Sequence, residues 1–70
     1  MDKKTKITEL VFRMKKVYPC WRYGQTIFNT LEMVEGYLAE KIRATKDDPF
    51  HKDIKENEVE AEIERLLNLK

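Results

Sequence analysis

Apolar residues recur along the chain at the spacing of an α-helix, and the sequence therefore predicts a helical protein. In the first part of the chain they return every three or four positions, which places their side chains on one face of a helix. This series stops before Pro19, because proline disfavours helical backbone at the preceding residue. We expect Thr5 to cap the first helix. The apolar positions of the series are Ile7, Leu10, Val11, Met14 and Tyr18.

A second apolar series begins after Pro19 and ends where Glu35 and Gly36 break the pattern. Gly24 falls at the centre of its apolar face. A glycine inside a helix costs about 1 kcal/mol relative to alanine, and close approach of another backbone would compensate for that cost. Gly24 therefore marks a point at which a second backbone segment could approach this helix. The apolar positions are Tyr23, Ile27, Phe28, Leu31 and Val34.

Two shorter helices and a turn account for the rest of the chain. A third helix is predicted roughly over residues 37–44, and residues 47–50, with the sequence Asp-Asp-Pro-Phe, are typical of a turn. We expect Asn57 to cap the last helix, because Glu60 follows it three residues later, as in a capping box. The apolar positions of the last helix are Val59, Ile63, Leu66 and Leu67.

These elements predict an all-α fold, a small single-domain bundle of about four short helices that spans residues 1–70. Of the 70 residues, 41% are hydrophobic and 39% are charged, which is typical of a globular domain with a highly charged surface. A core of this size leaves little net stability. Because added burial would help so short a chain, we also expect self-association as a homodimer.

No segment of the sequence is typical of a membrane protein or a secreted protein. The uncharged runs are far too short to cross a bilayer, and no apolar signal segment follows the basic N-terminus. The net charge of +1 gives no overall attraction to nucleic acid or to an anionic membrane. We therefore expect a cytoplasmic protein with no membrane partner.

Charge is distributed unevenly between the two ends of the chain. Residues 1–22 hold seven basic and two acidic side chains, whereas residues 46–70 hold five basic and eight acidic ones. One interpretation is that two solvated helix faces attract each other within the fold. The others are a basic patch for a partner, or head-to-tail self-association.

The sequence contains paired carboxylates, such as Asp47 with Asp48, but few of the residue arrangements that catalysis or metal binding requires. Cys20 is the only cysteine and His51 the only histidine, so no internal disulfide can form, and a conventional zinc site would need a second chain or several carboxylates. There is no glycine-rich phosphate loop, and neighbouring surface acids would need a cleft to separate their pKa values. We expect a protein that is not an enzyme, with no catalytic residue, no metal site and no cofactor.

A polar stripe runs beside the apolar face of the second helix. Arg22, Gln25 and Asn29 are spaced to form one ridge along a helix. We expect this stripe to hold the turn at residues 46–52: Arg22 would pair with a carboxylate of that turn, Asp48 or its neighbour, and an amide would bond its backbone. The alternative is that the stripe is a binding site.

The same residues resemble a family of small uncharacterised bacterial and phage proteins. Members of that family carry Arg-x-Gly-Gln-x-x-x-Asn followed by Asp-Pro-Phe-Tyr. The matching segments here are Arg22-Tyr23-Gly24-Gln25, Asn29 and Asp48-Pro49-Phe50-His51. The resemblance covers about residues 20–51, and His51 stands where tyrosine is usual. It implies a bacterial or phage origin and links the stripe to the turn, but it implies no activity.

Protein binding is the function that the sequence favours. The expected contact residues are Phe12, Arg13, Lys15, Lys16 and Trp21. Phe12 lies off the apolar stripe of the first helix, and Trp21 lies at a junction between helices. Each is either a satellite of the core or an anchor of the kind that interfaces favour. We expect a regulatory or accessory protein with a protein partner, such as an inhibitor of a host protein.

Nucleic-acid binding is the alternative function. The second and third helices, joined through Gly36, could form a helix-turn-helix. However, the third helix is short and carries Glu40, and the net charge is near neutral. A basic surface on the first helix could instead hold phosphates without reading bases. That surface consists of Lys6, Arg13, Lys15 and Lys16.

Overall fold

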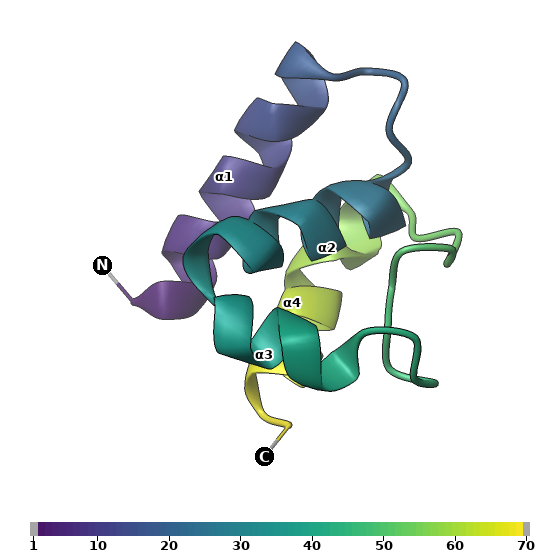
Figure 1. Cartoon of the computed structure of the whole chain (residues 1–70). Helices are drawn as coiled ribbons and strands as arrows, with labels where there is room; N and C mark the ends of the chain where they lie inside the picture. Colours follow the sequence, from purple (N-terminus) through teal and green to yellow (C-terminus); the bar gives the residue numbers. More distant parts are fainter. Residues whose placement is uncertain (1, 70) are drawn as a thin grey trace.

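The computed structural model describes residues 2–69, and this part of the chain is helical with no strand (Figure 1). Its elements are α1 (Lys3–Val17), α2 (Tyr23–Val34), α3 (Gly36–Ile42), a 3₁₀-helix (Glu56–Glu58) and α4 (Val59–Leu67). The expected all-α bundle of four short helices is thereby confirmed.

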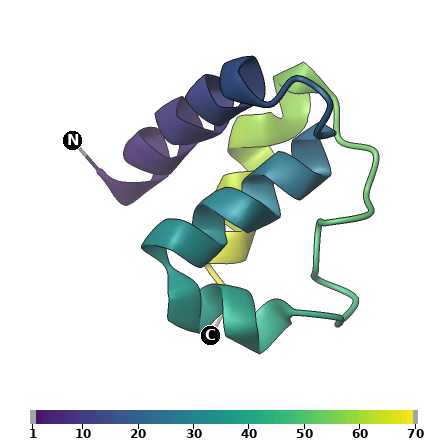
Figure 2. The same cartoon turned by 45° about the horizontal axis from the view of Figure 1, so that its top comes forward.

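The helices enclose one hydrophobic core, in which α1 packs against both α2 and α4 while α2 also packs against α3 (Figure 2). Burying a side chain the size of leucine contributes about 1.5–3 kcal/mol, so the apolar faces draw the four helices together. The fully or almost fully buried apolar residues are Ile7, Val11, Ile27, Phe28, Leu31, Ala39, Ile42, Val59, Ile63 and Leu66. Most of them belong to the apolar series in the sequence.

Two members of those series stay largely exposed. Tyr18 is 42% exposed because α1 ends at Val17, one residue before it. Val34 is 43% exposed and is the last residue of α2, beyond the part of this helix that is buried. A periodic pattern identifies a face of a helix but does not show where its neighbours stop covering that face.

Two expected helix caps are wrong. α1 begins directly after Asp2, whose Oδ1 accepts a hydrogen bond from Thr5 N (2.7 Å). Before α4, Glu58 Oε1 accepts a hydrogen bond from Lys55 N (3.0 Å), and Asn57 lies inside the 3₁₀-helix rather than at a cap. Both helix starts are strongly polar, so apolar periodicity could not place them.

α3 ends two residues earlier than expected, at Ile42. Ala44 has a φ of 62°, a left-handed conformation that cannot continue a helix. The Thr45 hydroxyl donates a hydrogen bond to Ile42 O (2.7 Å), which satisfies a carbonyl at the end of α3. The chain then leaves α3 as a long loop that passes along the start of α2 (Figure 2).

Candidate functional site

The loop after α3 contacts α2 backbone to backbone, at Gly24. A β-carbon built on Gly24 would lie 2.5 Å from the carbonyl oxygen of Lys52 and closer still to that of Pro49. Real β-carbons do not approach other atoms so closely, so this position requires glycine. The close approach of another backbone, which could offset the cost of a glycine in this helix, is therefore present at Gly24, and the approaching segment is the turn that was expected to be held by this helix.

The side chains of the polar stripe take a different place from the one expected. Arg22 is the N-cap residue of α2 and has extended backbone (φ −72°, ψ 161°), so it does not continue the helical ridge of Gln25 and Asn29. Arg22 is exposed, and the two amides are half-buried. Among the described residues, Arg22 forms no ion pair with the turn, and neither amide forms a side-chain hydrogen bond with the backbone of the turn, so both parts of this expectation are wrong. Asp47 Oδ1 instead accepts a hydrogen bond from the Arg65 guanidinium (3.0 Å).

Asp48 organises the turn from within. Its Oδ2 accepts a hydrogen bond from Ala44 N (2.8 Å), and its Oδ1 accepts one from Phe50 N (2.9 Å). The second bond spans Pro49 and forms a turn that mimics a backbone turn. The Phe50 ring packs edge-to-face on Phe28, with 6.0 Å between centroids. The Asp-Pro-Phe sequence therefore has a structural role.

Lys15 closes the loop between α1 and α2. Its Nζ donates hydrogen bonds to the carbonyl oxygens of Pro19 (3.0 Å) and Trp21, and it lies 5.2 Å from the centroid of the Tyr23 ring. A cation at this position satisfies carbonyl groups that follow the end of a helix. Lys15 was expected to contact a partner, but its ammonium group contacts carbonyl oxygens and an aromatic ring of this chain.

The other expected contact residues on α1 gather at a shallow hollow. Phe12 is half-buried against the core, and its ring meets that of Tyr23 edge-to-face at 5.9 Å. Arg13 and Lys16 are exposed, and together with Phe12 and Glu9 they line a hollow of about 450 Å³. The structure therefore brings Phe12, Arg13 and Lys16 together on one side of α1.

Trp21 lies outside that hollow, in the loop between α1 and α2. Its ring stacks on that of Tyr18, with 4.3 Å between centroids and 16° between planes. Trp21 N also donates a hydrogen bond to Tyr18 O (3.0 Å). The half-buried Trp21 ring is thus held by the loop itself.

Arg65 connects α4 to the loop after α3. Besides its bond to Asp47, its guanidinium donates to both oxygens of Glu62 (3.1 and 2.7 Å). These hydrogen bonds hold the pKa of the Glu62 carboxyl below its ordinary value, against the opposing effect of burial, and raise the pKa of Arg65. Lys52 Nζ lies 3.7 Å from Glu62 as well. The opposite charges are paired with one another, which indicates a structural role for this cluster.

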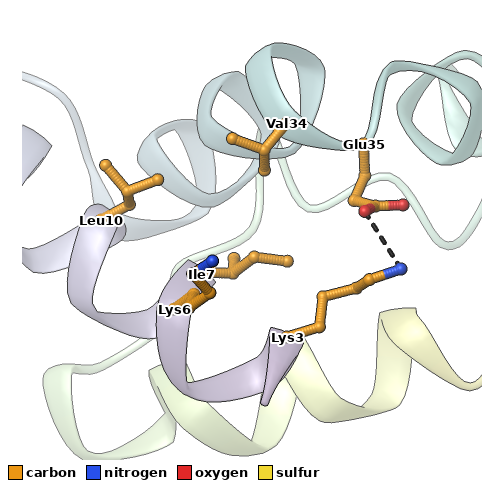
Figure 3. A pocket seen from close by; sticks show the side chains of 6 residues that line it. All are labelled: Lys3, Lys6, Ile7, Leu10, Val34 and Glu35. Carbon is orange, nitrogen blue, oxygen red and sulfur yellow. Dashed lines mark ion pairs between the residues drawn. The ribbon is translucent and has the colours of Figure 1, made fainter. Parts of the chain in front are cut away.

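A groove of about 500 Å³ runs between the N-terminal half of α1 and the end of α2 (Figure 3). It is lined by Lys3, Lys6, Ile7, Leu10, Val34 and Glu35. Figure 3 shows Leu10 and Val34 facing each other across it, while Lys3 Nζ and Glu35 Oε2 form an ion pair (3.2 Å) at one end. The walls of the groove are therefore apolar and its end is charged.

A second hollow, of about 470 Å³, adjoins the same ion pair. It is lined by Lys3, Glu35, Tyr37, Leu38, Lys41, Leu67 and Leu69. Tyr37 is 86% exposed although it is a large aromatic residue. We call the lining residues of the two hollows together the apolar face. It is formed by the N-terminal half of α1, the junction of α2 with α3, α3 itself and the residues Leu67 and Leu69.

The apolar face was not predicted from the sequence. A signal was present, because Val34, the last apolar position of the second series, and Tyr37, the first residue of the third predicted helix, lie on either side of Glu35 and Gly36. The groove itself depends on how α1 lies against α2, which periodicity does not give.

No protein-family model, curated protein or solved structure matches this chain. Within residues 2–69, no three histidine, cysteine, aspartate or glutamate side chains come together in a group that could hold a metal ion. In the same part of the chain, no helix has the length and apolar character required to cross a bilayer.

Proposed function

We propose that the chain is a small accessory protein that performs no chemistry of its own and acts by binding a protein partner. The observation that carries this proposal is the apolar face, where Val34 and Tyr37 stay exposed beside two adjoining hollows. Exposed apolar side chains that line a concave surface are typical of protein-binding sites. The aromatic residue at its edge is of the kind that anchors interfaces.

In the proposed role, this chain is encoded by a bacterium or by a phage, and it regulates a cytoplasmic protein of the bacterial host. The resemblance of residues 20–51 to small bacterial and phage proteins supports this origin. A chain of 70 residues can inhibit a larger protein by covering a surface that the larger protein needs. This role requires binding alone, which agrees with a sequence that holds one cysteine and one histidine.

A pull-down from bacterial lysate tests the proposal. Tagged wild-type protein is compared with Tyr37→Glu, on the apolar face, and with Lys16→Glu, on the other hollow of α1. Phe12 and Lys15 are poor probes, because both contact the fold. We expect the wild-type protein to retain a specific protein from the lysate, and one of the two variants, while still folded, to retain it no longer. The same background proteins with all three baits would contradict the proposal.

Nucleic-acid binding through α1 is the second candidate. Arg13 and Lys16 are exposed and form no ion pair within residues 2–69, which leaves their charges available to phosphates. A helix-turn-helix has less support, because Glu35 alone separates α2 from α3, whereas that motif has a turn of about three or four residues. Affinity for duplex DNA that falls steeply with salt would favour this candidate, and no binding at low salt would exclude it.

A further inference from the structure

The chemistry of the apolar face indicates what kind of segment it binds. We infer that it receives an amphipathic helix of a partner protein, with apolar residues on one side and acidic residues along its flanks. This inference rests on the proposed protein-binding function and specifies the partner. Three features carry it: the two hollows, the charges around them and the repulsion between like charges in a symmetric dimer.

The two hollows suit a helix better than an extended segment. They lie on either side of the Lys3–Glu35 ion pair and hold about 500 and 470 Å³. An amphipathic helix presents apolar side chains at i, i+3 or i+4 and i+7, so successive anchors can enter neighbouring hollows. An extended peptide usually pairs its backbone with the edge of a sheet, and residues 2–69 contain no strand.

The charges around the hollows favour an acidic partner. Their linings contain three lysines and one glutamate, and that glutamate is already paired with Lys3. Lys6 and Lys41 are exposed and form no ion pair within the part of the chain that the structure describes. Carboxylates on the flanks of a bound helix would meet these two ammonium groups. Such rim contacts fix the orientation and select the partner more than they add affinity.

The same charges disfavour a second copy of this chain as the occupant. A symmetric dimer would place the apolar face against itself, so that the lysines of the two copies would approach each other. The acidic residues Glu60 and Glu64 of α4 are already paired within the chain, because Lys4 Nζ lies 3.9 Å from Glu60 Oε2 and 3.7 Å from Glu64 Oε2. A head-to-tail contact with these residues would be heterologous and would tend to form open chains.

Peptide titration of the ¹⁵N-labelled full chain tests the inference. The probe is a synthetic helix of about 18 residues, with leucines at i, i+4, i+7 and i+11 and glutamates on the flanks. A second peptide carries lysine at each glutamate position. We expect the acidic peptide to shift the amide signals of Leu10, Val34 and Leu38, and to bind at least about tenfold more tightly than the basic one.

Surface variants make the assignment specific. Val34→Glu should weaken binding of the acidic peptide by about tenfold or more, because it places a carboxylate among the apolar anchors. Val17→Glu is the matched control, since Val17 is also exposed but lies outside both linings, and it should leave binding unchanged. The double variant Lys6→Glu, Lys41→Glu should reverse the preference in favour of the basic peptide. Circular dichroism confirms that each variant is folded.

Several results would overturn the inference. Signals that shift around Arg13 and Lys16 would move the binding surface elsewhere, while leaving the proposed protein binding intact. Equal binding of both peptides would refute the acidic partner. Concentration-dependent dimerisation abolished by Val34→Glu would assign the face to a second copy, and binding to vesicles of anionic phospholipid abolished by that variant would assign it to a membrane surface. The pull-down separately decides whether the chain binds a protein at all.

Discussion

Gly24 lies against the carbonyl oxygen of Pro49, and this contact fixes the loop after α3 on the start of α2. The backbone is constrained on each side of this contact. Gly24 belongs to the first turn of α2, and Pro49 is fully buried, with its φ set by the ring. The hydrogen bond from Phe50 N to Asp48 then spans the proline. The loop therefore packs through its backbone, which makes its position sensitive to a single methyl group.

Replacement of Gly24 by alanine should destabilise the fold strongly. The new β-carbon would collide with two carbonyl groups, neither of which is the end of a flexible side chain, so the loop or α2 would have to shift. We expect a loss of about 2–3 kcal/mol in the free energy of unfolding, the upper part of the range for overpacking. Urea denaturation monitored by circular dichroism measures it.

Gly36 provides the matched control for that substitution. It is the first residue of α3, and a β-carbon there would meet no atom within 4 Å. Gly36→Ala should leave stability unchanged or raise it by up to about 1 kcal/mol, because alanine favours the helix. A Gly24→Ala variant as stable as Gly36→Ala would show that the loop is not held against α2.

Lys15 should be required for the stability of the α1–α2 loop, whereas its neighbour Lys16 should not. Lys15→Met removes the hydrogen bonds to Pro19 O and Trp21 O but keeps the length of the side chain. We expect it to lower the free energy of unfolding by about 1–2 kcal/mol. The emission of Trp21, the only tryptophan, should shift to the red as its stack on Tyr18 loosens.

Lys16→Met tests whether that effect is local. Lys16 is exposed, and we expect its replacement to change stability by less than about 0.5 kcal/mol. If both variants lost the same free energy of unfolding and Trp21 emission stayed unchanged, stability would depend on the total positive charge of α1 and not on the hydrogen bonds of Lys15. Lys15 would then again be a candidate for contact with a partner.

Two kinds of feature could be predicted from the sequence: the buried face of a single helix, and positions that carry glycine or proline. The buried faces around Ile27 and Ile63 follow from helical periodicity, and Gly24 was compatible with a close backbone approach because glycine is otherwise unfavourable inside a helix. Pro19 likewise predicted the end of α1 to within two residues. In each case the local chemistry of the backbone leaves few alternatives.

Contacts between distant segments could not be predicted in the same way. Asp47 and Arg65 are 18 positions apart, and several other basic residues were equally plausible partners for that aspartate. The hollows of the apolar face depend on where α1 crosses α2 and on where the last turn of α2 stops packing against other helices. These quantities arise from the packing of whole helices and have no local signature.

The pairing of Glu62 with Arg65 should make the fold sensitive to acid. The pKa of Glu62 is lowered in the folded protein, chiefly by the hydrogen bonds from Arg65. A carboxyl whose folded pKa is depressed contributes stability above its ordinary pKa, here 4.5, and loses that contribution as the pH falls through the folded pKa. Wild-type protein should therefore lose more stability between pH 6 and about pH 3 than Glu62→Gln does.

Urea denaturation at several pH values tests that dependence. The control is Glu56→Gln, which removes a carboxylate that forms no ion pair within residues 2–69. Its loss of stability on acidification should match that of wild type. If Glu62→Gln and Glu56→Gln showed the same pH dependence, the Glu62–Arg65 pair would contribute nothing measurable, as is common for pairs open to solvent.

Asp48, rather than the amides of the polar stripe, should hold the turn. Asp48→Ala removes two hydrogen bonds to backbone N–H groups, those of Ala44 and Phe50, and should cost about 1–3 kcal/mol. Asp53→Ala, at an exposed position of the same loop, is its control and should change stability by less than about 0.5 kcal/mol. Thermal melts followed by circular dichroism compare the variants.

Asn29→Ala distinguishes the two interpretations of the stripe. Asn29 is half-buried, and alanine is the better helix former, so we expect this variant to lose less than about 0.5 kcal/mol. A loss as large as that of Asp48→Ala would mean that the stripe supports the turn through the Asn29 amide after all. If stability is unchanged but the partner found in the pull-down is lost, Asn29 belongs to a binding surface. Unchanged stability and unchanged binding would leave the turn to Asp48 and the Gly24 contact, as the geometry requires.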